Sequence, residues 1–369
     1  MEFKSNRNFT IGVELEFQLL SPENMELVPA APALLKKVPV NLRERIKQEF
    51  IQSMVEVTTD VCSSMDEVEE DLSSTIRILE SLCQKENVVT FAASLHPYSK
   101  ARDQRLSSNE RYKEILDELQ IVGRRLITQG LHVHVGLPDG QTAIKVFDQI
   151  RIFLPLLLAL STSSPFFQGE DTGLYSYRSK LFNALPRSGM PEPLGSWENY
   201  TKLIDLMRRA AIIKDPRDIW WDVRPHPHFG TIEIRICDLP SSMADILAIT
   251  AMIHVLVIEL ATDSLSCPVS HRAVITNNKW NALRRSVDGK YVEPYNLRQI
   301  PTRDALLDLV ERLRPASEDR GSERHLKQIK NIIKRGTSAH CQRRLYAQSG
   351  SFPEMIKAMR KEFWNIEKA

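Results

Sequence analysis

The chain has 369 residues, enough for a large core in one big domain or two ordinary ones. Its 49 lysines and arginines nearly balance its 47 aspartates and glutamates, so the overall charge does not favour nucleic acid or an anionic membrane as a partner. Five cysteines without a CxxC spacing fit reduced thiols in a cytoplasm better than a disulfide framework or a zinc site.

Neither export nor membrane insertion is expected. The first ten residues lack the apolar core of a signal peptide. The most apolar run, residues 152–160, is too short to cross a bilayer and contains Pro155, so it predicts a buried helix. No repeat or low-complexity linker divides the sequence, and we expect one domain over residues 1–369 in a cytoplasmic protein.

Four segments alternate between aliphatic and polar side chains, which is the pattern of half-buried β-strands. They are residues 9–20, 50–59, 130–137 and 231–238. In the last segment, three isoleucines alternate with Glu233, Arg235 and Cys237. We therefore expect the four strands to share one sheet that places its aliphatic face on helices. A shorter apolar strand is predicted at 88–94.

Helical patterns lie between and after these strands. Ser64 and Glu67 form a capping-box pattern before an apolar stripe, and Asn109 is a candidate N-cap. The apolar segments 143–161 and 242–261 predict helices packed beneath the sheet, the first of them bent at Pro155.

The remaining segments complete an α+β pattern. The longest loop-like segment, residues 163–195, has the length of a functional loop. An amphipathic helix is predicted at 196–213. From about residue 302 the pattern is helical and increasingly basic, with a break at Gly336.

The polar faces of the four strands would bring together four carboxylates, two imidazoles and a guanidinium: Glu14, Glu16, Glu56, His132, His134, Glu233 and Arg235. Neighbouring carboxylates raise one another's pKa unless cations neutralise them. An oxygen-rich set with one or two imidazoles favours Mg²⁺ or Mn²⁺ over zinc, and a guanidinium suits a phosphoryl group or a carboxylate. The pattern predicts metal-dependent phosphoryl chemistry on an antiparallel sheet.

Each part of this pattern also has a plainer interpretation. An ExE pair is common on solvated sheet faces, an HxH pair can be two hydrogen-bonded histidines, and Glu233 with Arg235 could be an ordinary ion pair. The joint occurrence on four strands favours a site. Six residues of adjoining loops could be ligand contacts or surface residues: His96, Arg178, Arg187, Arg224, His226 and His228.

Several motifs resemble the bacterial carboxylate–amine ligases of glutamate–cysteine ligase family 2, with the YbdK-type members most similar. The motifs are GVELEF at 12–17, NERY at 109–112, GLHVHVG at 130–136, YRSKLFNALPRSGMP at 177–191 and WWDVRPHPHFGTIEIR at 220–235. A weaker C-terminal signature, GTSAHCQRRLY, lies at 336–346. The resemblance thus extends over nearly the whole chain.

This resemblance implies a glutamine-synthetase-like catalytic fold, a curved antiparallel sheet of about six strands backed by helices. It also implies that ATP phosphorylates the side-chain carboxylate of glutamate and that an amine, typically that of cysteine, displaces the phosphate. The expected product is a γ-glutamyl amide, most simply γ-glutamylcysteine. ATP and amino acids would be the small-molecule partners, with Mg²⁺ or Mn²⁺ as the metal, and a homodimer is expected.

The resemblance assigns roles to the residues that match its motifs. The metal ligands would be Glu14, Glu16, Glu56, His132 and Glu233. Arg235 would act with Glu233 in catalysis by stabilising the phosphoryl group in transfer. The other expected roles are near the nucleotide for His134 and Arg224 and in substrate binding for Arg178, Arg187 and His96.

Two positions depart from the family pattern. Gln52, which the alternation places on the same face as Glu56, stands where relatives usually have a glutamate before Ser-Met, and a neutral amide predicts a weak metal site there. Leu95 stands where relatives usually have threonine, which removes a hydroxyl from the edge of the site. Three alternatives stay open: a guanidino-type phosphotransferase, a catalytically weakened nucleotide-binding relative and, least favoured, a zinc hydrolase built on His132 and His134.

Overall fold

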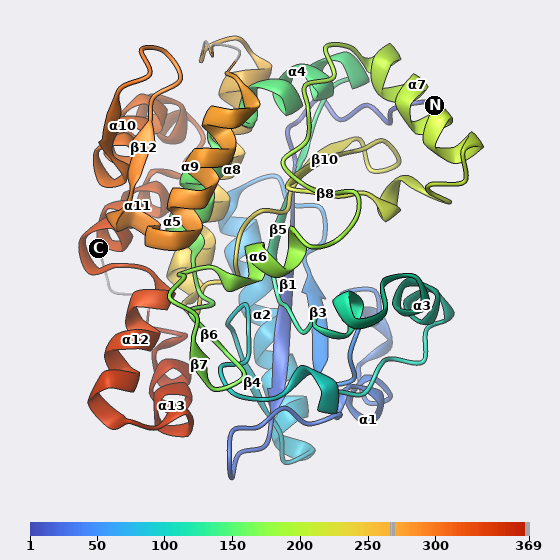
Figure 1. Cartoon of the computed structure of the whole chain (residues 1–369), viewed down its shortest axis with the longest axis vertical. Helices are drawn as coiled ribbons and strands as arrows, with labels where there is room; N and C mark the ends of the chain where they lie inside the picture. Colours follow the sequence, from blue (N-terminus) through green and yellow to red (C-terminus); the bar gives the residue numbers. More distant parts are fainter. Residues whose placement is uncertain (266, 268–269, 366–369) are drawn as a thin grey trace.

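A seven-stranded antiparallel sheet forms the centre of the protein, whose computed structural model describes residues 1–265, 267 and 270–365 (Figure 1). Six strands follow one another across the sheet in the order β10 (Val223–His226), β11 (Thr231–Ile234), β5 (Leu131–Gly136), β1 (Ile11–Leu20), β3 (Met54–Thr58) and β2 (Ile46–Gln48). The seventh, β4 (Val89–Phe91), pairs with the C-terminal half of β1. The four predicted strands are therefore neighbours.

The aliphatic face of the sheet lies on helices, as the alternation predicted. The helices α2 (Met65–Lys85), α4 (Gly140–Ile150) and α8 (Met243–Ala261) contact the strands. The strand side chains that face them, such as Leu15, Val133 and Ile232, have no exposed surface. Each such side chain contributes roughly 1.5–3 kcal/mol by its burial.

The helix α8 is apolar on all sides because it is enclosed on all sides. It is the only described helix whose length and composition would suit a membrane span, and 94% of its apolar window is buried inside the protein. Its burial is that of a core helix.

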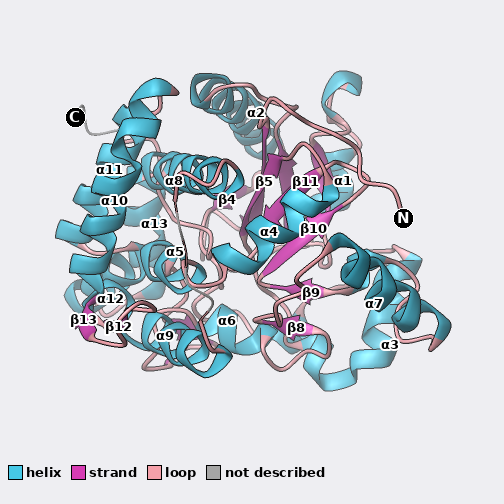
Figure 2. Cartoon of the chain, turned by 90° about the horizontal axis from the view of Figure 1, so that it is seen from above, coloured by secondary structure: helices cyan, strands magenta, loops and turns pink. Residues whose placement is uncertain are grey.

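A second helical layer covers α8 on the side away from the sheet (left in Figures 1 and 2). It consists of α5 (Leu154–Ser161), α10 (Thr302–Asp319) and α11 (Glu323–Arg335), which contact α8. Helix α9 (Arg272–Arg285) packs on α5, and the hairpin of β12 (Lys290–Val292) and β13 (Gln299–Pro301) packs on α10. Helices α12 (Ser338–Ser349) and α13 (Phe352–Glu362) pack on each other, and α13 also contacts the strand β4. The predicted break at Gly336 is confirmed, since this residue has a φ of +87° between α11 and α12.

On the other side of the sheet lie α3 (Glu110–Arg124) and α7 (Trp197–Arg209), visible at the right of both views (Figures 1 and 2). The predicted N-cap of α3 is confirmed, because the Asn109 side chain accepts a hydrogen bond from the Arg111 amide at 2.9 Å. The remaining short elements are α1 (Ala31–Leu35), β6 (Phe166–Phe167), β7 (Glu170–Asp171), α6 (Tyr177–Phe182), β8 (Ser188–Gly189) and β9 (Trp220–Trp221). The predicted loop 163–195 therefore has structure of its own.

The single bent helix predicted at 143–161 is wrong. Two helices, α4 and α5, replace it, and α5 begins one residue before Pro155. Proline has no amide hydrogen for the preceding turn and its ring collides with that turn, so the break is complete rather than a bend.

The predicted strand 231–238 also ends early. The amides of Arg235 and Ile236 both donate to the Asp222 carbonyl, at 2.9 and 3.1 Å, which is the pattern of a β-bulge. The bulge breaks the alternation, so Cys237 joins the hydrophobic core instead of the polar face predicted for it. Glu233 and Arg235 keep their predicted positions.

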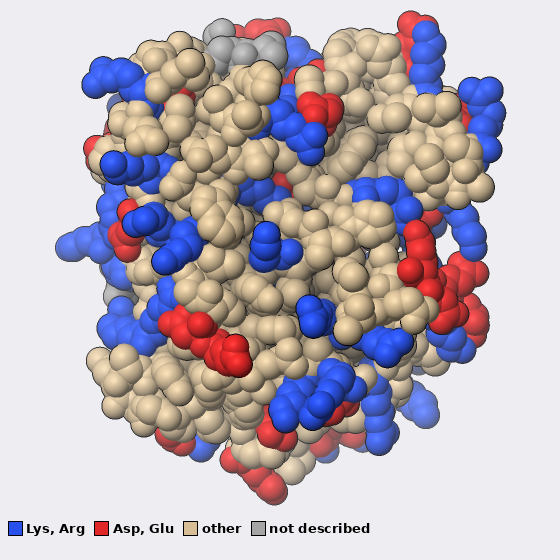
Figure 3. Space-filling view, viewed as in Figure 1, with Lys and Arg blue, Asp and Glu red and all other residues tan. Residues whose placement is uncertain are grey.

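The surface carries charges of both signs. In the view of Figure 3, lysine and arginine side chains are interspersed with aspartate and glutamate over the whole face.

All five cysteines are free thiols.

Candidate active site

Polar side chains cross the sheet in three rows on the face opposite α8. The strand register places the members of each row directly opposite one another: Arg224, Glu233 and His134; His132 and Glu14; Lys47, Glu56 and Glu16. Directly opposed residues in an antiparallel pair have Cβ atoms about 4.5–5.5 Å apart, close enough for their side chains to interact. Strand pairing therefore joins the polar side chains of the separate strands into one continuous polar surface.

A cavity of about 480 Å³ opens over this surface. The structure brings together in its lining all seven residues of the predicted polar face and also Arg224. Helix α3 contributes Arg111, Tyr112 and Ile115 from the opposite side.

One cluster of possible metal ligands lies at the β11 end of the surface. Glu14, His134 and Glu233 each offer one ligand atom within 4.8 Å of the others. His134 Nε2 lies 3.3 Å from Glu14 Oε1 and 3.8 Å from Glu233 Oε1, and His132 Nδ1 lies 3.2 Å from Glu14 Oε2. The mixture of oxygen and imidazole ligands suits a divalent cation.

Two buried imidazole nitrogen atoms in or beside this cluster form no hydrogen bond with any residue that the structure describes, although one of them lies 3.3 Å from a carboxylate oxygen of Glu14. They are Nε2 of His132 and Nε2 of His134, whose residues are 4% and 7% exposed. Buried polar atoms almost always have a partner, so orphaned imidazole nitrogens beside carboxylates fit a cation that they would ligate. This observation agrees with the donor set and supports a metal at this place.

The protonation of these groups follows from their neighbours. Burial acts to raise the pKa of Glu14, but the neighbouring imidazoles of His132 and His134 hold it well below its ordinary value. Burial opposes ionisation of Glu233 too, yet Arg224 and Arg235 lower its pKa. Burial lowers the pKa of His132, which leaves a neutral imidazole able to ligate a metal.

Glu233 is the most enclosed carboxylate of the site, with 1% of its surface exposed. Arg224 donates to its Oε2 through Nε and Nη2, at 2.8 and 2.7 Å, and Arg235 donates to its Oε1. Both guanidinium groups are thereby fixed in position at the edge of the cavity. Preorganised cations of this kind can stabilise charge that develops during a reaction.

A second cluster, at the β3 end, consists of Glu16, Glu49 and Glu56. Burial and then the charge of Glu16 raise the pKa of Glu49 to about 7. Burial and then the charges of Glu14 and Glu49 raise the pKa of Glu56 well above its ordinary value. Three carboxylates that repel one another in this way fit a second cation, which would relieve the repulsion.

Sequence reasoning missed Glu49, which directly follows the three-residue strand β2. It also placed Gln52 wrongly on the polar face beside Glu56, because the strand starts at Met54 instead of residue 50. Gln52 hydrogen-bonds through its amide to the Leu106 carbonyl at 2.9 Å, outside the cavity lining. The neutral Gln52 suggested that the site lacks one carboxylate, but Glu49 provides a third carboxylate beside Glu16 and Glu56. The only feature of the sequence that could have indicated Glu49 was its charge, seven residues before Glu56.

Folding of the metal-free protein is expected to weaken as the pH rises from about 5 to 8. The folded state holds a proton on Glu49 up to about pH 7, whereas the unfolded chain loses it near 4.5. The folded state binds more protons within this window, so the free energy of unfolding falls with rising pH, by about 2–3 kcal/mol for this group.

Urea unfolding in a chelator at pH 5 and pH 8 measures this difference. Glu49→Gln should reduce the difference between the two pH values, and added Mg²⁺ should reduce it in the unaltered protein. An equal pH dependence of the unaltered protein and the variant would contradict the expectation.

Three predicted substrate-binding residues lie outside the cavity lining. The buried guanidinium of Arg178 donates to the carbonyls of Arg235 and Ile236, at 3.3 and 3.4 Å. Arg187 pairs with Glu118 at 3.1 Å. His96 is completely buried, with Nε2 2.8 Å from the Met25 carbonyl and Nδ1 accepting from the Ser99 amide. Leu95 is buried in a neighbouring hydrophobic cluster.

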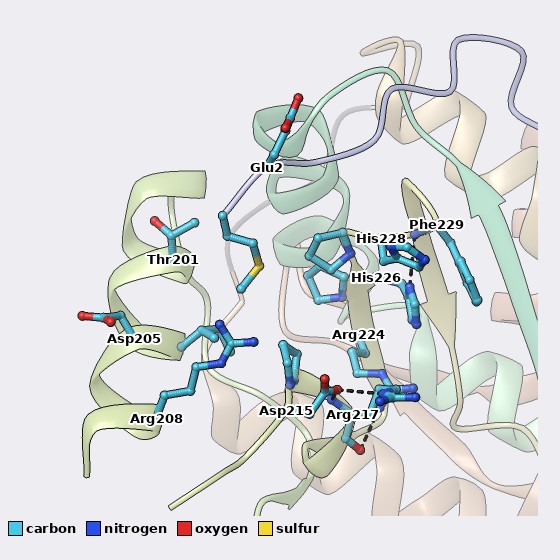
Figure 4. A pocket seen from close by; sticks show the side chains of 15 residues that line it. Glu2, Thr201, Asp205, Arg208, Asp215, Arg217, Arg224, His226, His228 and Phe229 are labelled. Carbon is cyan, nitrogen blue, oxygen red and sulfur yellow. Dashed lines mark hydrogen bonds and ion pairs between the residues drawn. The ribbon is translucent and has the colours of Figure 1, made fainter. Parts of the chain in front are cut away.

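A second cavity, of about 670 Å³, adjoins the first (Figure 4). Arg217, Arg224, His226 and Phe229 line both. Figure 4 shows Thr201, Asp205 and Arg208 of α7 on one side and the β10–β11 hairpin, with His226, His228 and Phe229, on the other. The rings of His226 and Phe229 stack at 4.1 Å. Arg224 was expected in a loop, but it lies on the edge strand β10, where Pro225 is tolerated.

The N-terminal segment closes one side of this second cavity, where Met1 and Glu2 belong to the lining. The Lys4 amide donates to the Pro227 carbonyl at 3.0 Å, and the Asn6 amide donates to the Leu137 carbonyl at 2.8 Å. Gly230 has a φ of +69°, and a Cβ there would lie 1.7 Å from the Lys4 carbonyl oxygen. The hairpin turn therefore requires glycine at this position, because of its positive φ and because a side chain would collide with the N-terminal segment.

Comparison with known proteins places the chain in a recognised group. A family model described as Glutamate-cysteine ligase family 2 (GCS2) matches residues 10–360. The chain is 37% identical over 361 residues to a protein of Gloeobacter violaceus, and the match covers 96% of each chain. It is 35% identical over 357 residues to a protein of Herpetosiphon aurantiacus, and that match covers 96% of this chain and 93% of the relative. Both carry the name "Putative glutamate--cysteine ligase 2".

Two solved structures share the fold. The glutamate–cysteine ligase of Francisella tularensis, in complex with AMP, superposes with a TM-score of 0.70 at 14% identity over 100% of this chain and 91% of that one. A bifunctional glutathione synthetase from Pasteurella multocida gives a TM-score of 0.72 at 16% identity, over 96% of this chain and 52% of that one. The predicted α+β fold, an antiparallel sheet backed by helices, is confirmed.

Proposed function

Because the chain belongs to glutamate–cysteine ligase family 2, we propose that it is an ATP- and Mg²⁺-dependent carboxylate–amine ligase. It joins the side-chain carboxylate of glutamate to an amine through an acyl phosphate and forms a γ-glutamyl amide, for which γ-glutamylcysteine is the family precedent. Family membership supports a ligase of the glutamate–cysteine ligase type. The finer assignment rests on one observation, the two carboxylate clusters with two buried imidazole nitrogens beside them that form no hydrogen bond to a described residue.

The proposed metal ligands form two sets. Glu14, Glu233 and the two histidines would hold one Mg²⁺ at the β11 end. Glu16, Glu49 and Glu56 would hold another at the β3 end. Such ions would supply charge that neutralises the phosphate oxygens of ATP and orients them for transfer.

The arginines act on the group in transfer. Arg235, fixed by Glu233, lines the cavity and neutralises the charge that develops on the phosphoryl group as it moves from ATP to the glutamate carboxylate. The bond from the phosphoryl phosphorus to the ADP oxygen breaks, and one to the carboxylate oxygen forms. Arg224 keeps Glu233 ionised and in place. A preorganised charge of this kind contributes about 10²–10³ in rate.

The second cavity is the proposed place of the nucleoside. It is joined to the first at Arg224 and His226, next to the cluster of Glu14, His134 and Glu233. The stacked rings of His226 and Phe229 and the prolines near them form a flat apolar surface that suits a purine base. The phosphates then extend toward Glu233 and Arg235. A cytoplasmic homodimer, with the whole chain as one catalytic domain, belongs to the same proposal.

The function is tested by ADP release and product analysis with glutamate, ATP and Mg²⁺. Hydroxylamine serves as a small acceptor that traps an acyl phosphate as γ-glutamyl hydroxamate, and cysteine serves as the family's acceptor. We expect ADP and hydroxamate in equal amounts, with little of either when glutamate, ATP or Mg²⁺ is omitted.

Two results would contradict the proposal. ADP formation with a stable phosphorylated product and no amide or hydroxamate would favour a guanidino-type phosphotransferase. Failure of Mg²⁺–ATP to bind in calorimetry would favour a relative without catalytic activity.

A further inference from the structure

Lys279 of helix α9 forms a buried ion pair behind the active site. Its Nζ donates to both carboxylate oxygens of Asp222, at 2.9 and 2.7 Å, and to Oδ1 of Asn183 at 3.0 Å. Lys279 and Asp222 are 5% and 8% exposed, and neither belongs to the lining of the first or the second cavity. Lys279 therefore does not act by touching a molecule in these cavities.

Asp222 lies between β9 and β10, and its main chain holds the bulge at the end of β11. The Asp222 carbonyl accepts from the amides of Arg235 and Ile236, and the Asp222 amide donates to the Gly189 carbonyl at 2.9 Å. Lys279 thus fixes the side chain of the residue whose carbonyl holds the amide of Arg235.

Both backbone groups of Arg235 end on residues of buried ion pairs. Its amide donates to Asp222, the partner of Lys279, at 2.9 Å. Its carbonyl accepts from Arg178 at 3.3 Å, and Arg178 lies 4.0 Å from Asp238. The path of the chain at Arg235 therefore depends on two ion pairs that lie outside the cavity lined by its guanidinium.

The Asp222 carboxylate depends on Lys279. Among the residues that the structure describes, only Lys279 donates a hydrogen bond to this carboxylate or lies within 4.0 Å of it as a cation. A buried carboxylate without a cation is costly, and it lowers this cost by turning toward water or by drawing water in. Either change would disturb the main chain of Asp222 and the bulge that its carbonyl holds.

We propose that Lys279 is a positioning residue for phosphoryl transfer: by holding Asp222, it sets the position of Arg235 in the cavity. This role rests on the proposed ligase function, in which Arg235 stabilises the phosphoryl group. A stabilising charge acts fully only when it is already in place, and a displacement of about 1 Å can cost about 100-fold in rate. The effect should be on kcat and only slightly on the KM for ATP, because neither Lys279 nor Asp222 lines the proposed nucleoside cavity.

Lys279→Met is the first variant of the test. It leaves the Asp222 carboxylate buried without a cation, so we expect the melting temperature and kcat to fall, kcat by about 10–100-fold. The KM for ATP should change little. The initial rate of γ-glutamyl hydroxamate formation gives both constants, at a temperature at which circular dichroism shows the variant to be folded.

The double variant Asp222→Leu with Lys279→Met separates positioning from stability. Replacing a buried ion pair by apolar residues of similar volume often preserves or raises stability, whereas removing one partner lowers it. We expect the double variant to melt near the unaltered protein and to keep the low kcat of Lys279→Met, because the ion pair that fixes the bulge is absent from both. Recovery of kcat together with the melting temperature would overturn the proposal, because Lys279 would then contribute to stability alone.

Lys145→Met is the matched control. Lys145 of α4 also forms an ion pair, with Asp263 at 2.9 Å, but lies outside both cavities, so the control should keep the kcat of the unaltered protein. If a Lys279→Met protein does not fold, Asp222→Asn replaces it, because this change removes the charge and keeps the shape of the side chain. An unchanged kcat in any folded variant of the pair would overturn the role of Lys279.

Hydroxamate formation by the unaltered protein separates this role from the ligase function. If the unaltered protein forms no hydroxamate with glutamate, ATP and Mg²⁺, the ligase function and the role of Lys279 are both overturned. If it forms hydroxamate and the variants keep its kcat, the role of Lys279 is overturned and the ligase function stands.

Discussion

Replacing Glu233 by glutamine is expected to lower the rate of ADP release at least about 100-fold. Glu233 binds two guanidinium groups and belongs to the first cluster of possible metal ligands, so a neutral amide removes a proposed metal ligand and the anchor of Arg235 together. The substitution also leaves two buried arginines without their carboxylate, and such unpaired charges cost about 3–5 kcal/mol of stability. The measurement is the initial rate of ADP formation, with Mg²⁺ affinity measured by calorimetry.

The stability loss must be separated from the loss of activity. Thermal melting followed by circular dichroism shows whether the variant is folded at the assay temperature. Glu170→Gln is the control, because Glu170 is exposed on β7 and lies outside both cavities. A folded Glu233→Gln variant that keeps the rate and the Mg²⁺ affinity of the unaltered protein would remove Glu233 from the site.

The second large effect is expected at Asp238, a completely buried carboxylate behind the active site. Its Oδ2 accepts from the Ser163 amide at 2.9 Å and the Ser164 hydroxyl at 2.7 Å, and its Oδ1 accepts from the Ser176 hydroxyl at 2.8 Å. Asp238→Asn turns an amide NH₂ toward one of these donors. The free energy of unfolding should fall by about 3–5 kcal/mol, as for other broken buried charge networks.

Activity should fall with stability in this variant. Arg178 lies 4.0 Å from Asp238 and donates to the carbonyl of Arg235, so the network supports the bulge that carries Arg235 into the cavity. Urea unfolding and kcat measure the two effects. Asp171→Asn is the control, because Asp171 forms an exposed ion pair with Arg343 of the kind that is worth about 0–1 kcal/mol. A change of stability no larger than that of the control would contradict the expectation.

The alternation of single strands was sufficient to predict the main features of the site. It identified β1, β3, β5 and β11 as strands with an aliphatic and a polar face, and these strands are neighbours in the sheet. Because side chains alternate strictly along a strand, the positions of Glu14, Glu233 and the others of the polar face followed directly. Long-range pairing added the order and the register of the strands.

What the sequence did not predict depends on tertiary contacts. The strand β2 is too short to show alternation, so Glu49 had no pattern to reveal it. Arg178 has a long side chain, and only the packing of helix α6 decides that it points to backbone carbonyls instead of into the cavity. The bulge after Ile234 arises from two amides that share the Asp222 carbonyl, a contact between different strands.

The two ligand clusters differ in how deeply they are built into the sheet. The first takes its residues from the interior strands β1, β5 and β11, where any shift of backbone would disturb the core. The second depends on Glu49, which follows the outermost strand. A short insertion or a single exchange in that peripheral hairpin would change the second proposed ion site and leave the backbone of the first in place.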